Sequence, residues 1–522
     1  MGYNPGMTPL GTAASYWMDS TPETSYPSLD DDATADVAVI GGGIAGICTA
    51  WELARTGRSV VLLEADCIVA STTGHTTAKV SAQHTLIYEH LRSSLGAQTA
   101  REYGQSQLDA IEHVVRTVDE LGIDCDLERR PAFTYVGSDE QIPLIHAEAA
   151  AAQAAGLPAC VVEQTKLPYP IAAAVRVDDQ VQLHPRRYLL ALADDLARRG
   201  GRIFENTRVV GLHEGTPCRI STADGITVTA DAVVVATHYP IFDRAALFSR
   251  LTPHRELVVA APISTDRDPG GMYITPDENT RSVRTAPYRD GQRLLIVTGE
   301  SFALGAPDVA SRAHRLAGWV EEHFQARPSY HWAAQDNSTT DRLPYIGKFH
   351  LGAKHVYVAT GFGGWGMSNG VVAGRLLTAL LNGAGGTEGT EGTEPTVLSW
   401  AKIYDPCRIH PKVEARSFVT ANLRNARHFI ADRFGASEAS SSEDLPPDSG
   451  AIMGPRGSKC AVYRDTAGEI HAVSATCTHL GCTVAFNDLE RTWDCPCHGS
   501  RFGVDGSVLH GPATRPLEQL DR

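Results

Sequence analysis

Asp36-Val-Ala-Val-Ile-Gly41-Gly-Gly43-Ile-Ala-Gly46 begins the stretch that decides the fold, and the stretch ends at Val60-Val-Leu-Leu-Glu64. Its pattern predicts an apolar strand, a glycine turn, a helix and a second apolar strand that ends in an acid. Gly41 allows the tight turn, Gly43 lets the backbone approach a pyrophosphate, and Gly46 permits close helix packing. The helix N-terminus directs its dipole at phosphates, and Glu64 would accept hydrogen bonds from a ribose. The stretch therefore predicts a dinucleotide site on a Rossmann-like α/β domain.

Two later segments indicate which dinucleotide is bound. Asp231-Ala-Val-Val-Val-Ala236-Thr237 predicts another buried strand, and Val356-Tyr-Val-Ala-Thr-Gly361-Phe-Gly363-Gly364-Trp365-Gly366-Met367 predicts a strand that runs into a glycine-rich helix start. The second segment repeats the GxGxxG spacing, but no strand ending in an acid follows it, which argues against a second nicotinamide site. A helix N-terminus aimed at a flavin ring explains the segment better, since its dipole would stabilise the negative charge of reduced flavin.

A second motif lies near the C-terminus. Cys477-Thr-His479-Leu-Gly-Cys482 is followed by Cys495-Pro-Cys497-His498-Gly-Ser500. Two pairs of one cysteine and one histidine are typical of a Rieske [2Fe–2S] centre, in which two thiolates hold one iron and two imidazoles the other. A zinc site with the same four ligands is the alternative, and incidental thiols are a third interpretation. The order and spacing favour the Rieske centre, a one-electron carrier.

This motif resembles the cytochrome bc and b6f branch of Rieske proteins. The resemblance implies a disulfide between Cys482 and Cys497 that clamps the two loops over the cluster. The chain contains no Asp/Glu-x-x-His-x-x-x-x-His segment, which argues against the mononuclear iron site of a Rieske oxygenase. Phe502 stands where that branch often has a tyrosine, so one hydroxyl near the cluster is missing and Ser500 remains to supply a hydrogen bond.

The span from about Asp36 to Leu381 resembles the D-amino acid oxidase, sarcosine oxidase and glycine oxidase group of FAD enzymes. Thr340-Asp341-Arg342-Leu-Pro344-Tyr-Ile346-Gly347 stands where this group has a similar Asp-x-Leu-Pro-x-Ile-Gly segment. The resemblance implies FAD as cofactor and oxidation of CH–NH bonds as the commonest chemistry. Ser71-Thr-Thr-Gly-His75 also resembles the Thr-Thr-x-His stretch that carries a histidyl–flavin bond in dimethylglycine and sarcosine dehydrogenases. Covalent attachment through His75 and a simple hydrogen bond near the flavin both remain open.

The candidate site residues follow from these motifs. The residues expected to bind FAD are Gly41, Gly43, Ile44, Ala45, Gly46, Glu64, Ala65, Thr73, Gly74, His75, Thr76, Val209, Ala236, Thr237, Gly361, Gly363, Gly364, Gly366 and Met367. The catalytic candidates are Asp341, Tyr345, Trp365 and Arg284. Arg281 and Arg284 could each clamp a substrate carboxylate, but three positions along a strand put them on opposite faces, so at most one reaches the pocket. The metal ligands are Cys477, His479, Cys495 and His498.

The expected organisation has several parts. We expect an α/β FAD-binding domain with an α+β antiparallel-sheet substrate domain and a small all-β Rieske domain. The expected ranges are a leader at 1–35, the FAD-dependent oxidoreductase at 36–400, a helical connector at 401–434, a linker at 435–450 and the Rieske domain at 451–522. Within the oxidoreductase, the FAD-binding parts are about 36–90, 175–245 and 330–400, and the substrate parts about 91–174 and 246–329.

Composition sets limits on partners. A net charge of −15 argues against nucleic acid, and 522 residues with 43% hydrophobic content suffice for about three domains. No run of about eighteen apolar residues and no secretory signal pattern is visible, so we expect no membrane span. The cysteines outside the cluster motif are scattered, which favours a reducing cytoplasm with the disulfide as an exception.

The cofactor pair suggests the reaction. Flavin accepts two electrons and a Rieske centre accepts one, so electrons must pass between them singly. We expect oxidation of a C–N bond in an amine or amino acid, N-methylated ones included, with the Rieske centre handing electrons to an external one-electron partner such as a ferredoxin, a cytochrome or a quinone. Two alternatives remain: reversed flow, in which the partner is a donor and the Rieske centre feeds a flavin reductase, and an electron carrier without catalysis.

Overall fold

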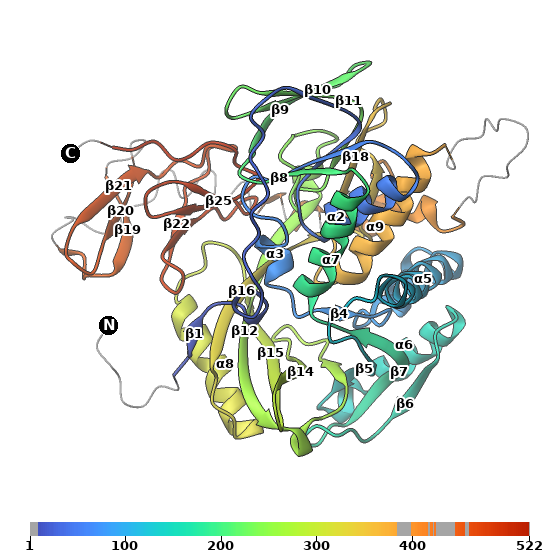
Figure 1. The fold of residues 1–522 in the computed structure, drawn as a ribbon. Coiled ribbons are helices and arrows are strands. Elements are labelled where there is room, and N and C mark those ends of the chain that lie inside the picture. The colour runs from blue at the N-terminus through green and yellow to red at the C-terminus, as the bar shows by residue number, and fades with distance from the viewer. Residues whose placement is uncertain are drawn as a thin grey trace, which may run out of the picture.

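The structure is a computed structural model that describes residues 9–383, 398–415, 418–420, 422–423, 444–454 and 459–520. Two large sheets form the body of the molecule, and two small sheets form a C-terminal domain at its side (Figure 1). No helix within these described ranges is long and apolar enough to cross a membrane.

The first large sheet has eight strands and a parallel centre. Its main order is β17 (Tyr345–Lys348), β18 (Val356–Thr360), β11 (Thr227–Val235), β2 (Ala33–Ile40), β3 (Val60–Leu63) and β8 (Arg202–Phe204), with β10 (Cys218–Thr222) and β9 (Val209–His213) continuing from β11. The pairs from β18 to β8 are parallel. Parallel strands are covered on both faces, which explains why β3, Val-Val-Leu-Leu, is wholly buried.

Helices α2 (Ile44–Arg55), α7 (Pro185–Arg198) and α9 (Gly366–Leu381) cover this sheet, and α2 packs against the other two. The approach of α9 to α2 needs glycine. A Cβ at Gly370 would come within 2.8 Å of the Ile44 side chain, and one at Gly374 within 2.8 Å of the Cβ of Cys48. Both helices begin at the carboxyl ends of the parallel strands, where ligands of open α/β sheets bind.

The second large sheet has ten strands and is mostly antiparallel. Its main order is β1 (Thr12–Ala13), β16 (Tyr330–Thr339), β12 (Leu251–Ser264), β15 (Gln292–Phe302), β14 (Ser282–Arg289), β13 (Met272–Ile274), β5 (Glu128–Val136), β7 (Ala173–Gln182) and β4 (Lys79–Val80), and β6 (Ala159–Val162) pairs with β7. Alternating burial along β16 shows that one face is packed and the other less covered.

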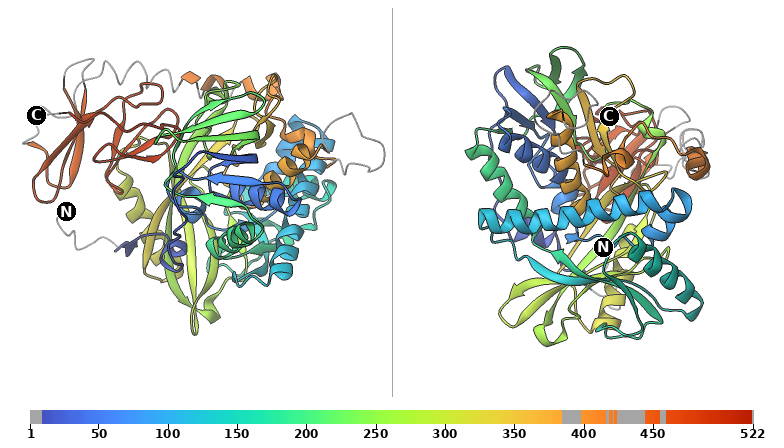
Figure 2. Two further views of the ribbon diagram at one scale, coloured as in Figure 1. Left: turned by 45° about the horizontal axis from the view of Figure 1, so that its top comes forward. Right: turned by 90° about the vertical axis from the view of Figure 1, so that its right-hand side faces the viewer.

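The remaining helices lie around this sheet. They are α3 (Ser71–Gly74), α4 (Ile87–Ser94), α5 (Ala97–Leu121), α6 (Ile142–Ala154) and α8 (Val309–Phe324), with short 3-10 turns at Asp139–Gln141, Leu247–Ser249, Thr265–Arg267 and Ala401–Tyr404. Helix α5 runs across the molecule between the two large sheets (Figure 2). It ends at Gly122, whose φ of 62° is the left-handed conformation that commonly terminates helices.

The N-terminal segment, expected to be a polar leader, is part of the fold from its first described residues. Strand β1 pairs in parallel with β16, and α1 (Tyr16–Asp19) buries Trp17 to 1% exposure. The indole nitrogen of Trp17 donates to the carbonyl of Thr76, and the hydroxyl of Ser15 donates to that of Gly74. These contacts tie the segment to the loop that holds His75.

The C-terminal domain consists of two antiparallel sheets. The first is β19 (Ser449–Met453), β20 (Cys460–Arg464) and β21 (Ile470–Ser474), and the second is β22 (Ala485–Asn487), β23 (Thr492–Asp494), β24 (Arg501–Gly503) and β25 (Val508–His510). Figures 1 and 2 show it beside the first large sheet and α8. Its core includes Trp493 and Phe502, both with 0% exposure.

Several expected boundaries differ from the observed elements. Strands β7 and β16, placed by their sequence in the FAD-binding parts, belong to the ten-stranded sheet. An apolar strand pattern does not say which sheet the strand joins, because partners distant in sequence decide that. Strand β19 begins at Ser449, inside the expected linker. Most of that linker, 435–443, and much of the expected helical connector lie outside the described residues.

Candidate functional site

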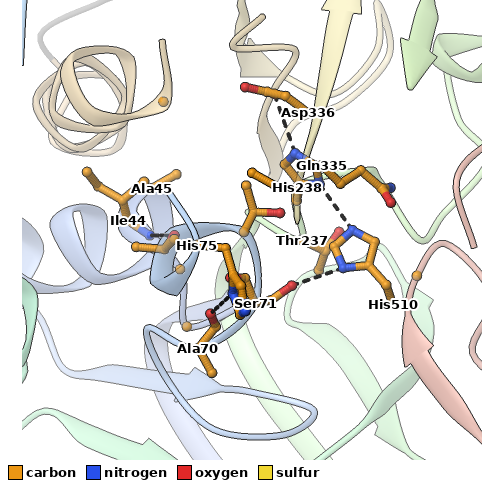
Figure 3. Close-up of a pocket in the computed structure, with 18 of the residues that line it drawn as sticks. Ile44, Ala45, Ala70, Ser71, His75, Thr237, His238, Gln335, Asp336 and His510 are labelled. Atoms are coloured by element: carbon orange, nitrogen blue, oxygen red, sulfur yellow. Dashed lines mark hydrogen bonds and ion pairs between the residues drawn. The ribbon is translucent and has the colours of Figure 1, made fainter. Parts of the chain in front are cut away.

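A cavity of about 520 Å³ lies at the carboxyl ends of the parallel strands. Its walls come from the turn after β2, the end of β3, the loop around α3, the segment after β11, the turn before α9 and strands β12, β15 and β16 of the large sheet. Figure 3 shows this region. All the residues expected to bind FAD line the cavity except Gly46, Gly74 and Gly363.

The turn after β2 is shaped by glycine. Gly41 has a φ of +107°, a conformation that L side chains rarely adopt, and a Cβ at Gly46 would lie 1.8 Å from the Gly41 carbonyl oxygen. Glycine at these positions lets the chain turn sharply and start α2 at the cavity wall. The Thr73 hydroxyl accepts a hydrogen bond from the backbone N–H of Ile44 at 3.1 Å. Helix α2 therefore directs its positive end at the cavity.

Glu64 closes the end of β3. Its carboxylate accepts hydrogen bonds from the N–H groups of Gly42, at 2.7 Å, and Asp66, at 3.0 Å. Burial raises the pKa of this carboxyl, while the two N–H groups oppose the rise. The side chain lies on the cavity, so its oxygens are available to a hydroxyl there.

The second glycine turn lies opposite, between β18 and α9. Gly361 and Gly364 have φ values of +76° and +87°, and a Cβ at Gly361 would lie 2.4 Å from the Thr339 side chain. The carboxylate of Asp336 accepts a hydrogen bond from the N–H of Gly364. The N-terminus of α9 thus also faces the cavity, as the sequence predicts.

His75 lies on the cavity wall just after α3. Its Nδ1 is 2.7 Å from the carbonyl oxygen of Ser71, so Nδ1 carries the proton and Nε2 is the unprotonated nitrogen of the neutral ring. Burial lowers the pKa of His75, which favours that neutral form. Its own carbonyl accepts from the indole of Trp332. This placement is compatible with either mode of flavin attachment.

None of the four catalytic candidates lines the cavity, and the first two, Asp341 and Tyr345, lie near β17. Asp341 is fully buried and bound by the Arg408 guanidinium through two contacts of 2.7 and 2.9 Å. Burial opposes ionisation of Asp341, but the charge of Arg408 outweighs it and lowers the pKa. The Tyr345 ring lies between Arg250 and Arg408, whose guanidinium carbons are 4.4 and 4.3 Å from its centroid. Neither residue lines the cavity, and both stabilise the chain around β17.

The other two candidates are Trp365, directly before α9, and Arg284, on strand β14 of the ten-stranded sheet. The Trp365 indole stacks on His84, with centroids 4.3 Å apart, and the Lys79 ammonium lies 5.3 Å from the Trp365 centroid. Arg284 has 1% exposure and donates to the Ala78 carbonyl at 2.6 Å. Neither lines the cavity. Arg281 pairs with Glu300 at 2.8 Å and is likewise outside it.

The C-terminal motif forms two adjacent loops. The rings of His479 and His498 lie with centroids 5.1 Å apart, and both Nδ1 atoms are buried without a hydrogen-bond partner among the residues that the structure describes. Cys477 and Cys495 are buried, and their thiols interact directly. Two thiols and two free imidazole nitrogens that meet at one place form the donor set of a Rieske cluster.

The remaining two cysteines of the motif form a disulfide. Cys482 and Cys497 are bonded, with Cα atoms 6.7 Å apart, and the sulfur of Cys495 lies within 4.8 Å of both of theirs. The bond therefore joins the two loops next to a ligand position. Ser500 has 0% exposure and its hydroxyl interacts with Cys477, while Phe502 is buried in the core.

The cluster loops pack against the segment that follows β11. The His498 ring lies 6.0 Å from the Tyr239 ring and 5.9 Å from that of Phe248, in both cases edge to face. Tyr239 directly follows Thr237 and His238, which line the cavity. One short segment after β11 thus contacts a cluster ligand and the cavity at once.

Several residues at this site have no signal in the sequence. His510 of β25 bridges to Ser71 at 2.9 Å and to His238 at 3.2 Å, and His238 lies 3.5 Å from the Asp336 carboxylate (Figure 3). Arg255 of β12 pairs with Glu490 of the C-terminal domain. These groups are far apart in sequence and meet only when the two domains dock.

Comparisons with known proteins agree with this geometry. Residues 36–380 match the family described as FAD dependent oxidoreductase, and residues 437–521 match the Rieske [2Fe-2S] domain. The chain belongs to the FAD dependent oxidoreductase family. It also carries a C-terminal Rieske domain, as the sequence predicts. The putative Rieske 2Fe-2S iron-sulfur protein YhfW of Bacillus subtilis is 34% identical over 97% of both chains.

Other proteins are similar to this chain at lower identity. The gamma-glutamylputrescine oxidoreductase of Escherichia coli is 25% identical over 71% of this chain and 89% of its own. Glycine oxidase from Geobacillus kaustophilus has a TM-score of 0.58 at 20% identity, covering 72% of this chain and 99% of its own. L-proline dehydrogenase from P. horikoshii has a TM-score of 0.56 at 18% identity, covering 72% and 98%. These two structures confirm the fold of the oxidoreductase part.

The residues present fit both cofactors. The glycine turns leave the space and the N–H groups that a pyrophosphate needs, and Glu64, directly after β3 on the cavity wall, would accept hydrogen bonds from a ribose. The unpartnered Nδ1 atoms of His479 and His498 and the thiols of Cys477 and Cys495 fit a [2Fe–2S] cluster. The protein is therefore an FAD enzyme with a Rieske centre docked beside its cofactor cavity.

Proposed function

We propose that this chain oxidises a C–N bond of an amine or amino acid, N-methylated ones included, and passes the electrons singly through its Rieske centre to an external acceptor. Bound FAD supplies acceptance of a hydride equivalent, and the cluster supplies transfer of one electron at a time. The overall reaction converts an amine and two oxidised acceptors into an imine, two reduced acceptors and two protons. The acceptor is an external one-electron carrier, of which a ferredoxin, a cytochrome and a quinone are the candidate classes.

The observation that carries this proposal is the contact between His498 and Tyr239. A cluster ligand packs on the residue that directly follows two residues of the FAD cavity wall. The two cofactor sites therefore share one wall, and a large movement of the Rieske domain is unnecessary for electrons to pass between them. Relatives named as an amine oxidoreductase and an amino acid oxidase support the substrate class.

The exposure of the two imidazole ligands supports an outward route. His498 has 5% exposure and faces the oxidoreductase part, whereas His479 is partly exposed and its neighbour Leu480 has 41% exposure. An external carrier reaches the His479 side more readily than the His498 side. We propose that electrons enter at His498 and leave near His479.

The chain's own residues would prepare the substrate side. The ten-stranded sheet covers the cavity with Val258, Thr298 and Ala334, which exclude water from its apolar side, while Glu256 supplies a carboxylate there. Exclusion of water strengthens electrostatic interactions with a bound substrate. The structure brings none of Asp341, Tyr345, Trp365 or Arg284 onto this wall, so we place substrate orientation on the wall residues instead.

An anaerobic screen tests the proposal. Candidate amines, N-methyl amines and amino acids are mixed with the full chain, and the absorbances of flavin and cluster are followed together. We expect a true substrate to bleach the flavin and then the cluster. Bleaching only by dithionite or a reduced ferredoxin would contradict the proposal and favour reversed flow or a carrier without catalysis.

A further inference from the structure

We infer that the Rieske domain is part of the FAD-binding site and closes it, so that FAD enters and leaves only when this domain undocks. The FAD family match ends at residue 380, so no residue of the Rieske domain belongs to that match. Five of the Rieske residues on the cavity wall are Glu490, Arg501, Leu509, His510 and Ala513. The inference concerns cofactor binding and does not depend on which substrate is oxidised.

One part of this wall is an ion-pair network. Arg255 of the oxidoreductase has 1% exposure and pairs with Glu490, while its guanidinium lies 3.7 Å from Asp494. Arg501 binds the same two acids at 3.0 Å each. Burial acts to raise the pKa of Glu490, but the charges of Arg255 and Arg501 outweigh it and hold the pKa at about 2. Removing one partner of such a buried network leaves uncompensated charge, so the network holds the two domains together.

The other part is His510. Its Nδ1 contacts the Ser71 hydroxyl and its Nε2 contacts Nδ1 of His238, so the ring spans two cavity segments of the oxidoreductase. Figure 3 shows this bridge across the labelled residues. Ser71 begins α3, the helix that leads to His75. A ring held between α3 and the segment after β11 blocks the gap between two FAD-binding elements.

Docking also depends on contacts outside the cavity. The Asp488 carboxylate accepts a hydrogen bond from the N–H of Ala310, in the first turn of α8, at 3.0 Å. Gly305, with a φ of +74°, faces the Rieske loop so closely that a Cβ there would lie 3.2 Å from Pro496. Neither Asp488 nor Gly305 lines the cavity. These two positions allow docking to be weakened without touching the FAD site itself.

The test compares full-length variants loaded with both cofactors. D488A removes the carboxylate that accepts the hydrogen bond from the N–H of Ala310 in α8. G305N keeps a residue that tolerates positive φ but wedges a side chain against Pro496. H510A removes the bridge. D465A is the matched control, because Asp465 interacts within the Rieske domain, with His471 and the N–H groups of Ala467 and Glu469. Cluster absorbance verifies that each variant is folded.

FAD release after dilution is followed by the rise in flavin fluorescence. Iodide quenching of that fluorescence is a second readout, which works even if FAD is covalently attached. We expect release or quenching to increase about tenfold in D488A, G305N and H510A, equivalent to about 1.4 kcal/mol, and to stay unchanged in D465A. Unchanged values in D488A and G305N would overturn the inference, even if H510A changed, because His510 would then be a local contact and not part of a closing domain.

Discussion

The ring of His498 packs edge to face against Tyr239, with centroids 6.0 Å apart, directly beside the FAD cavity. This contact predicts that Tyr239 supports electron transfer between the cofactors. Tyr239→Leu should slow the reduction of the cluster by reduced flavin, because the aromatic ring that contacts His498 is lost. Tyr239→Phe keeps this ring and should leave the rate of cluster reduction unchanged. Stopped-flow absorbance without oxygen measures both rates.

A control separates this effect from loss of stability. Tyr88 is equally buried and lies far from the cluster loops in the core around α4, so Tyr88→Leu should leave the inter-cofactor rate unchanged. Removing a large buried side chain costs roughly 3 kcal/mol of stability, so the rates are compared well below the unfolding temperature. Equal rates in Tyr239→Leu and the parent would exclude this route.

The disulfide predicts the stability of the cluster. Replacing Cys482 or Cys497 by Ser should accelerate thermal loss of the cluster, because a cross-link closing a loop of this size stabilises by roughly 3 kcal/mol in chain-entropy estimates. The flavin spectrum should change less. Cys460→Ser is the control, since Cys460 is a free cysteine of the same domain. Two free thiols found by mass spectrometry in cluster-loaded protein would refute the bond.

The histidine ligands predict a separation of the two half-reactions. His479→Ala or His498→Ala removes an imidazole and should abolish the Rieske spectrum, while substrate still reduces the flavin. Turnover with an external one-electron acceptor should collapse, although slow reoxidation by oxygen can persist. Full turnover with the external acceptor in these variants would mean that reduced flavin passes its electrons to that acceptor without the cluster. Loss of flavin reduction by substrate would favour reversed electron flow.

Lys79 predicts a pH dependence of stability. Burial lowers the pKa of Lys79 to about 8, whereas the pKa of a lysine in the unfolded chain is about 10.4. Between these values the unfolded chain binds more protons, so this residue makes stability rise with pH across that interval. Lys79→Met should stabilise the protein by up to about 3 kcal/mol at neutral pH, and the gain should fade toward about pH 10.

Thermal midpoints at several pH values between neutral and alkaline check the effect. Lys402→Met replaces an exposed lysine and should leave the pH dependence of the parent intact. A Lys79→Met variant with the same pH dependence as the parent would show that burial does not lower the pKa of Lys79 in the folded protein.

Local patterns predicted much of the site. Some residues act through the conformation of their own turn, so their spacing in a single sequence is enough to predict their role. These are the glycines of residues 41–46 and 361–366 and the acid Glu64. The cluster motif is similar, because both halves are short loops with fixed ligand types. The fold class and both cofactors follow from these segments and are confirmed by the family matches.

Interactions between distant segments could not be predicted in this way. Asp341 and Tyr345 lie in a family segment, yet Arg408 and Arg250 bind them from elsewhere and hold them away from the cavity. The expected division into an oxidoreductase part, a linker and a Rieske domain also gave no indication of the wall that the two parts share. His238 and His510 carry no local signal, and only docking of the Rieske domain brings their rings together.

Strand β1 has a consequence for biosynthesis. Thr12 pairs with Tyr330, so the earliest described strand has no partner until the ribosome has made most of the oxidoreductase. Pairing of such distant segments is slow because a long loop must close first. The nascent chain therefore carries an unpaired strand and the exposed indole of Trp17 through most of its synthesis, a state that invites chaperone binding. A bulky tag fused near the amino end would hinder the insertion of this strand beside β16.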